Sequence, residues 1–193
     1  MKKVSKLKNI LLAMAVLSTA SFAGDEFKFL PIFLDDNWDA KVEVAAVIGS
    51  TNFDRDGINS GVNYGLDLSF ECPVFTLAGK HHIRQQLTLS RYDKNDYEVT
   101  VIEMNPYYFF DISKDLTLGV GPGIGAMNAK MPNGNDEWLF TVQSGAGLKY
   151  YMDNNILIGA DIRYQWTAEK SFGTGVKQDL DNMRVLLKVG YAY

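Results

Sequence analysis

The sequence predicts an all-β protein, an eight-stranded antiparallel up-and-down transmembrane β-barrel over residues 41–193. Three observations lead to this prediction. Apolar and polar residues alternate with a period of two in eight successive runs, one side of each run is nearly free of charge, and polar connections separate the runs. An even number of such runs, each about ten residues long, is typical of strands that cross a membrane as a closed barrel.

The N-terminus has the pattern of a secretory signal peptide. Lysines precede a short apolar run at residues 10–17, and the small residues Ser21 and Ala23 follow it. This run is shorter than the roughly 18 apolar residues that a membrane-spanning helix needs. We therefore expect residues 1–23 to direct export and to be cleaved before Gly24. Losing these lysines makes the net charge more negative than −4, which argues against nucleic acid as a partner.

Residues 24–40 and the single cysteine add two constraints. Residues 24–40 are apolar without strand or helix periodicity, and we expect them to lie in the periplasm before the barrel. They would serve there as an interfacial anchor or as a plug, and the sequence does not choose between the two. Cys72 is the only cysteine, so no internal disulfide is possible and stability must come from burial and hydrogen bonding.

The first four predicted strands lie between residues 42 and 110. Residues 42–48 and 62–70 place an apolar side chain at every second position, as a strand with one buried or lipid-facing side requires. The pattern at 83–89 is interrupted by Gln85, and the fourth run covers 100–110.

The last four predicted strands complete the barrel. Residues 116–126 alternate apolar side chains with glycine, and 138–150 have Ser144 as the one polar exception on the apolar face. Residues 156–166 alternate most regularly, and 183–193 keep the two-residue rhythm to the last residue. No helical periodicity of comparable length is present, so we expect strands throughout.

The connections differ in length in a way that suggests an orientation. Shorter connections are expected at 72–80, 111–115 and 153–155, and longer polar ones at 50–60, 128–137 and 167–181. Membrane barrels have short periplasmic turns and longer extracellular loops. The shorter set is therefore predicted to face the periplasm.

Aromatic residues occur at both ends of the runs. Tyr108, Phe110 and Tyr150 lie beside the shorter connections, whereas Trp138 and Trp166 lie at the opposite ends. Two aromatic belts around an aliphatic band are expected where rings sit at the depth of lipid headgroups. The apolar face is therefore predicted to contact lipid.

The face opposite the apolar one carries five acids and five bases. A soluble barrel that binds lipid would have the reverse pattern, with apolar side chains inside. Buried charges must be paired, and equal numbers of the two signs allow that pairing. We predict a charge network in the lumen formed by Glu43, Asp67, Glu71, Arg84, Glu103, Lys149, Asp161, Arg163, Arg184 and Lys188.

The last run ends in an aromatic residue that follows apolar residues at every second position: Val185, Leu187, Val189, Tyr191 and Tyr193. This pattern resembles the C-terminal β-signal that the barrel-assembly machinery of the outer membrane recognises, although that signal more often ends in Phe. With the signal peptide and the eight runs, the chain resembles the small Gram-negative outer-membrane barrels of the OmpA/OmpX-like class. The resemblance implies location in the cell outer membrane, with outer-membrane lipids and the assembly machinery as partners.

The predicted function is a structural or surface-interaction role with a largely plugged lumen, because eight strands leave an interior that side chains can fill. The alternative is a narrow channel or transporter for small or hydrophobic molecules. One observation that bears on this choice is the glycine series at inward positions 119–125. These glycines either make room for Tyr107, Phe109 and Tyr151 or form the smooth wall of a ligand cavity.

Pro106 and Pro122 also bear on the alternative. Both are predicted to face lipid on neighbouring strands, and each removes one hydrogen bond from the sheet. Matching Phe110 with Leu116 across the turn places Pro106 opposite Val120. We favour a β-bulge at each proline, and the other possibility is a weakened seam through which a hydrophobic molecule leaves sideways.

No residue pattern predicts catalysis, a cofactor or a metal site. His81 and His82 are consecutive, so in a strand they point to opposite faces. Residues 52–57 imitate the start of a calcium loop, but Asn63 stands where a bidentate glutamate is needed, and a turn rich in Asx residues is favoured. We expect no enzyme activity, and the sequence does not identify an extracellular partner.

Overall fold

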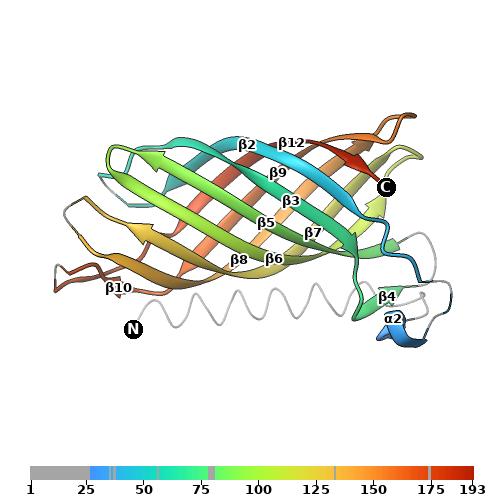
Figure 1. The fold of residues 1–193 in the computed structure, drawn as a ribbon, viewed down its shortest axis with the longest axis horizontal. Helices are drawn as coiled ribbons and strands as arrows, with labels where there is room; N and C mark the ends of the chain where they lie inside the picture. The colour runs from blue at the N-terminus through green and yellow to red at the C-terminus, as the bar shows by residue number, and fades with distance from the viewer. Residues whose placement is uncertain are drawn as a thin grey trace.

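The computed structural model describes residues 27–34, 36, 38–55, 57–77, 81–132, 134–173 and 175–193, so the predicted signal peptide lies outside the described residues. Eight antiparallel strands close into a barrel in the order β12, β2, β3, β5, β6, β7, β8 and β9 (Figure 1). Successive barrel strands are neighbours, and the last pairs with the first along eleven residue pairs. The predicted up-and-down barrel is confirmed.

The barrel strands form where the alternating runs were predicted, and several are longer. β5 and β6 extend past the predicted runs because a two-residue turn joins them. Asn95 and Asp96 form this turn with φ angles of 51° and 63°, the left-handed conformation that suits a tight hairpin. The strands are β2 Glu43–Phe53, β3 Gly61–Glu71, β5 His81–Lys94, β6 Tyr97–Asp111, β7 Leu116–Lys130, β8 Asp136–Tyr151, β9 Ile156–Thr167 and β12 Asn182–Ala192.

The N-terminal segment contains regular structure, which its sequence did not indicate. β1 (Phe27–Phe29) pairs antiparallel with β4 (Phe75–Leu77), and α2 (Pro31–Leu34) follows β1. Each short strand supplies the hydrogen-bonding partner that the other lacks, and neither sequence alone reveals it. β4 and α2 lie at the barrel end that carries the C-terminus (Figure 1). No helix among the described residues is long and apolar enough to span a membrane.

We call the end of the barrel with the C-terminus the inner end and the opposite end the outer end. The outer end carries the Asn95–Asp96 turn and two further short strands, β10 (Lys170–Ser171) and β11 (Lys177–Gln178), which pair with each other. These two strands lie in the connection between β9 and β12. That connection was predicted as a long polar loop.

The outward face of the barrel is an apolar belt. Burial alternates along β12. Leu187 and Val189 point outward and are each 59% exposed, whereas Leu186, which points inward, is buried. Aromatic pairs flank the belt: Tyr191 and Tyr193 stack edge to face at the inner end, and Tyr164 contacts Trp166 toward the outer end. The belt therefore has the aliphatic middle and aromatic borders of a lipid-facing surface.

The β6–β7 seam is interrupted around two prolines. Met104 pairs with Ile124, and Tyr108 pairs with Val120, with the ladder open in between. Since the register is the same on both sides, Pro106 stands directly opposite Pro122. The predicted register, with Pro106 opposite Val120, is wrong by two residues.

The turn explains the difference in register. Phe110 pairs with Leu118 rather than with Leu116, because the turn is closed by backbone bonds from Ile112 and Ser113 to the carbonyl of Leu116. Leu116 is thereby held within the turn. The turn encloses residues 112–116 instead of the predicted 111–115, so it has the predicted length but is shifted by one residue, which moves the register by two.

The predicted bulges are also wrong. A bulge places unequal numbers of residues on the two strands, whereas the interruption contains three residues of each strand, 105–107 and 121–123. On the far sides, Gln85 pairs with Pro106 and Pro122 pairs with Ser144 in unbroken ladders. Both missing N–H donors therefore fall in the one seam that the two prolines share, which leaves six residues unpaired there without shifting either strand.

Candidate functional site

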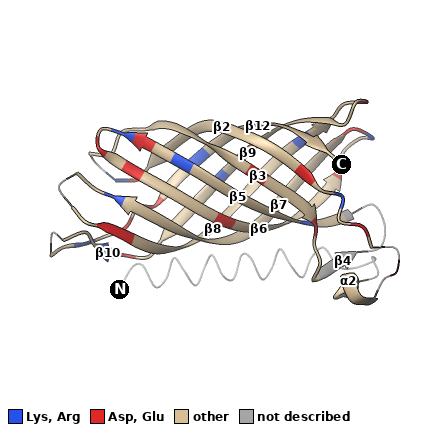
Figure 2. Cartoon of the chain, viewed as in Figure 1, with Lys and Arg blue, Asp and Glu red and all other residues tan. Residues whose placement is uncertain are grey.

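The interior of the barrel is the candidate site, because strand alternation directs every second side chain into it. All ten residues of the predicted charge network lie there, and the most exposed of them, Glu71, is only 8% exposed. Charges of both signs occur along the strands rather than gathering at one end (Figure 2). They form two groups, which differ in position and in the number of partners.

The inner charge group consists of Glu43, Glu71, Arg84 and Lys149, near the inner end. The Lys149 Nζ atom lies 2.5 Å from Glu43 Oε2, and Arg84 bridges Glu43 at 3.0 Å and Glu71 at 3.1 Å. The Tyr151 hydroxyl donates a hydrogen bond of 2.8 Å to Glu43 Oε1. Two acids and two bases make this group electrically neutral.

The central charge group is larger, and Arg163 is its hub. Its guanidinium lies 2.9 Å from Glu103, 2.5 Å from Asp161 and 3.7 Å from Asp67. It also donates to Thr88 at 3.0 Å and to Gln86 at 3.1 Å. A guanidinium presents five N–H donors in a planar fork, which suits this multiple contact better than an ammonium group.

Two further bases complete the central group. Lys188 Nζ lies 3.0 Å from Asp67 and 2.7 Å from Asp161, and Arg184 donates from Nη2 to Glu103. The group has three acids and three bases, so it is neutral as well. Its members are Asp67, Glu103, Asp161, Arg163, Arg184 and Lys188.

The outer part of the lumen is apolar, a feature that the predicted charge network does not include. Phe172 and Leu180 come from the connection between β9 and β12, Ile58 comes from the first loop, and all three are buried. The missed signal is that the inward positions at the outer ends of β6, β7 and β8 are apolar, such as Val101, Met127 and Leu139. We call this cluster the outer apolar core: Phe53, Ile58, Tyr92, Val99, Val101, Met127, Ala129, Met131, Leu139, Phe172 and Leu180.

Hydrogen bonds hold the loops over this core. The Tyr92 hydroxyl donates to the carbonyl of Asn59 at 2.6 Å, and its ring packs edge to face on Phe53. The Thr167 N–H donates to Asp181 Oδ1 at 2.8 Å, and the Asn135 N–H donates to the carbonyl of Phe172 at 3.1 Å. The loops therefore add both side chains and backbone contacts to the mouth of the barrel.

The inward glycines make room for aromatic side chains. A Cβ atom at Gly119 would lie 2.5 Å from the Phe109 ring, and one at Gly145 would lie 2.4 Å from the Tyr107 hydroxyl. This confirms the space-making interpretation for Tyr107 and Phe109. Tyr151 is not among the nearest contacts of these glycines, and its hydroxyl belongs to the inner charge group.

The five residues of the predicted assembly signal lie along β12 and just after it. Val185, Leu187, Val189 and Tyr191 point outward and are between 43% and 59% exposed. Tyr193 is 79% exposed, and its N–H donates to the carbonyl of Val42 at 2.8 Å. All five side chains are therefore open to the surroundings of the barrel.

Candidate metal ligands do not converge in the described part of the chain, where no three His, Cys, Asp or Glu residues are placed to hold a metal ion. His82 Nδ1 lies 3.9 Å from Glu71 Oε1, at the edge of the inner charge group. The buried carboxylates face arginine and lysine rather than open space. Their arrangement favours neutralisation of charge over coordination of a cation.

Comparisons with known proteins agree with this geometry. A family described as "Outer membrane protein beta-barrel domain" matches residues 10–192. No curated protein matches the chain by sequence.

Solved structures share the fold at low sequence identity. The N-terminal β-barrel domain of Pseudomonas aeruginosa OprF has a TM-score of 0.57 at 17% identity, over 80% of this chain and 100% of that one. The attachment invasion locus protein Ail of Yersinia pestis has a TM-score of 0.54 at 14% identity, over 81% and 100%. Neisserial surface protein A has a TM-score of 0.53 at 16% identity, over 79% and 96%.

Proposed function

The chain belongs to the outer membrane protein β-barrel domain family, and from that premise we propose that it is a structural or surface-interaction barrel whose lumen is closed. Its location is the outer membrane, and its apolar belt lies in lipid. The proposed role is non-enzymatic and needs no cofactor.

The filling of the lumen is the observation that carries this proposal. The two charge groups are buried and neutral, so a permeating ion would have to displace paired charges. Next to the outer end, an ion would have to leave water for the outer apolar core, which disfavours charge strongly. Two unlike barriers in series favour a barrel without steady conductance.

Recording in planar bilayers tests the proposal. The purified barrel should give no sustained conductance steps, and its different gel migration before and after boiling should verify that it is folded. The variant Glu103→Ala/Arg184→Ala is the matched control, because it removes one acid and one base together and leaves the central group neutral. Conductance by that variant alone would support the proposal, whereas sustained steps from the unaltered chain would overturn it.

Labelling of intact cells tests which end faces outward. Asp96→Cys places a thiol at the tip of the β5–β6 hairpin, and Asn154→Cys places one in the turn between β8 and β9. Native Cys72 is buried and gives a low background. A membrane-impermeant maleimide should label Asp96→Cys and spare Asn154→Cys, and the reverse result would mean that the loops proposed for surface contacts face the periplasm.

We also propose that the outward side chains of residues 185–193 are recognised during assembly by the barrel-assembly machinery. Tyr193→Asp should lower the inserted amount while inserted molecules remain folded, since a charge at the membrane border costs only about 0–1 kcal/mol. Tyr150→Asp is the matched control, because Tyr150 is also outward, aromatic and near the inner end, with 47% exposure. Equal losses in the two variants would show a general intolerance of charge and would refute recognition.

The second candidate function is lateral release of a hydrophobic molecule through the β6–β7 seam. The opposed prolines favour it, since they leave the seam short of two donors at lipid depth. A disulfide in Pro106→Cys/Pro122→Cys would close the seam reversibly. Uptake of the hydrophobic probe N-phenylnaphthylamine should then fall under oxidation and recover under reduction. Equal uptake by the oxidised and the reduced variant would exclude this route.

A further inference from the structure

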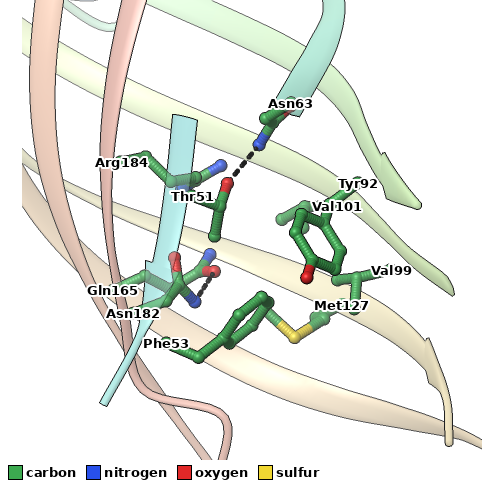
Figure 3. A pocket seen from close by; sticks show the side chains of 10 residues that line it. All are labelled: Thr51, Phe53, Asn63, Tyr92, Val99, Val101, Met127, Gln165, Asn182 and Arg184. Carbon is green, nitrogen blue, oxygen red and sulfur yellow. Dashed lines mark hydrogen bonds between the residues drawn. The ribbon is translucent and has the colours of Figure 1, made fainter. Parts of the chain in front are cut away.

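A small cavity lies at the boundary between the central charge group and the outer apolar core (Figure 3). One side of it is polar, with Asn63, Asn182 and Arg184, and the other side is apolar, with Phe53 and Met127 among its lining residues. The free space admits about one water molecule. No drug-sized or chain-like ligand fits without displacing the packed side chains.

Polar atoms of the cavity wall have no hydrogen-bond partner among the described residues. These atoms are Nε and Nη1 of Arg184, Oδ1 of Asn63 and Oδ1 of Asn182. All three residues are 1–2% exposed, so bulk water does not reach them. Leaving a buried polar group without a partner destabilises the folded state, and a charged group does so more strongly.

The remaining bonds of these side chains determine which atoms are left over. The Asn63 amide donates to Thr51 Oγ1 at 2.9 Å, and the Asn182 amide donates to Gln165 Oε1 at 3.1 Å. Both amide oxygens are thus left as acceptors. Arg184 uses Nη2 for Glu103, so its other nitrogens are left as donors.

We propose that this cavity binds one ordered water molecule, which accepts a hydrogen bond from Arg184 and donates to Asn63 and Asn182. One donor and two acceptors around a space of this size match the two to four partners that a buried water makes. The water gives Arg184 one further acceptor where the lumen changes from charged to apolar.

A charged occupant fits less well than water. The central charge group is neutral with three acids and three bases, so a bound anion would add an unpaired negative charge to a buried site. A cation would lie against the guanidinium of Arg184. An apolar occupant would leave the same donors and acceptors unsatisfied.

Filling the cavity tests the proposal by the sign of a stability change. Val101 lines the cavity, and Val101→Ile adds one methylene there. If the cavity holds the proposed water, the substitution expels it and leaves Arg184, Asn63 and Asn182 without that hydrogen-bond partner. The urea midpoint of unfolding should then fall. If the cavity is dry, the added methylene improves packing and the midpoint should stay or rise, which would overturn the proposal.

Val185→Ile is the matched control, because Val185 faces lipid and is 46% exposed. Its midpoint should stay within error of the unaltered chain. Val99→Ile, which adds a methylene from a neighbouring position of the same cavity, repeats the test should Val101→Ile alter the gel migration that reports folding.

Magnetic relaxation dispersion of water counts the long-lived buried waters directly and separates this effect from strain. The amplitude should drop by about one water in Val101→Ile and remain in Val185→Ile. An unchanged amplitude in Val101→Ile would overturn the proposal. So would an anomalous peak for bromide beside Arg184 in crystals soaked with that halide, since the occupant would then be an anion.

Discussion

The two halves of the lumen are built from the same strands but are stabilised by different physics. The inner and central charge groups depend on directional contacts such as the 2.9 Å pair of Arg163 and Glu103. The outer apolar core depends on removing side chains such as Leu139 and Phe172 from water. Directional pairing fails when one partner is lost, whereas apolar burial declines with the area removed.

The difference teaches that a barrel interior has no single composition rule. Within the membrane span, charges on one strand find partners across the lumen. Near the outer end, the loops cover the mouth, and the interior there resembles the core of a soluble protein. A polar interior is the usual pattern for outer-membrane barrels, so the apolar half is the part that departs from expectation.

The largest effect is expected from Glu103→Gln. Glu103 accepts from Arg163, Arg184 and Gln165, and it is fully buried. Neutralising it leaves two arginines without their shared carboxylate, and breaking a buried ion pair this way costs about 3–5 kcal/mol. Urea unfolding in lipid vesicles measures the loss. A loss below about 1 kcal/mol would mean that the network contributes no more than surface charges do.

A smaller loss is expected from Leu139→Ala in the outer apolar core. Leu139 is 1% exposed, and truncating a buried leucine costs about 2–5 kcal/mol. We expect the lower part of that range, because the loops over the core can relax into the space. The control is Leu187→Ala, which is 59% exposed to lipid and leaves no internal cavity. Equal losses at the two sites would contradict a packed outer core.

The same substitution, Tyr to Phe, can be made in each half of the lumen, and the two losses of stability can be compared. Tyr151→Phe deletes a bond to the carboxylate of Glu43 and should cost about 1.5–3 kcal/mol. Tyr92→Phe deletes a bond to the carbonyl of Asn59 and should cost about 0.5–1.5 kcal/mol, because the acceptor is neutral. The same unfolding assay ranks the two. The reverse order would refute the division of the lumen into a directional half and an apolar half.

The smallest effect is expected from Glu98→Gln on the exposed β5–β6 hairpin. Glu98 lies 2.8 Å from Arg91 and 3.5 Å from Lys130, and all three side chains are at least 40% exposed. Solvent screens such pairs, so the loss should be about 0–1 kcal/mol. The substitution is chemically identical to Glu103→Gln, and the ratio of the two losses measures what burial adds to an ion pair.

Much of the architecture could be predicted from local pattern. Alternation along residues 183–193 determined which side chains of β12 face lipid, since successive side chains of a strand point to opposite sides. The same rule identified inward charges such as Arg163 and Lys188. The local pattern could not predict which charges pair with each other. Lys188 and Asp67 are 121 residues apart, and only closure of the barrel brings them together.

Three features of the structure could not be predicted from the sequence, and the reasons are related. The β6–β7 register depended on how the turn before Leu116 closes, and a two-residue error there moved Pro106 from Val120 to Pro122. The β1–β4 pair needed two distant segments that show no pattern individually. The outer apolar core includes Phe172 from the connection between β9 and β12, and the strand pattern does not show that this residue packs against the barrel strands.

The sequence by itself determined the number of strands, the face each presents to lipid and the balance of the inward charges. These follow from the two-residue period of a strand, a local property of the backbone. Only the tertiary structure decided which charges pair, where the lumen becomes apolar and that both prolines weaken one seam. Each of these depends on the relative position of distant strands, and strand register is a property of the closed barrel rather than of any one run.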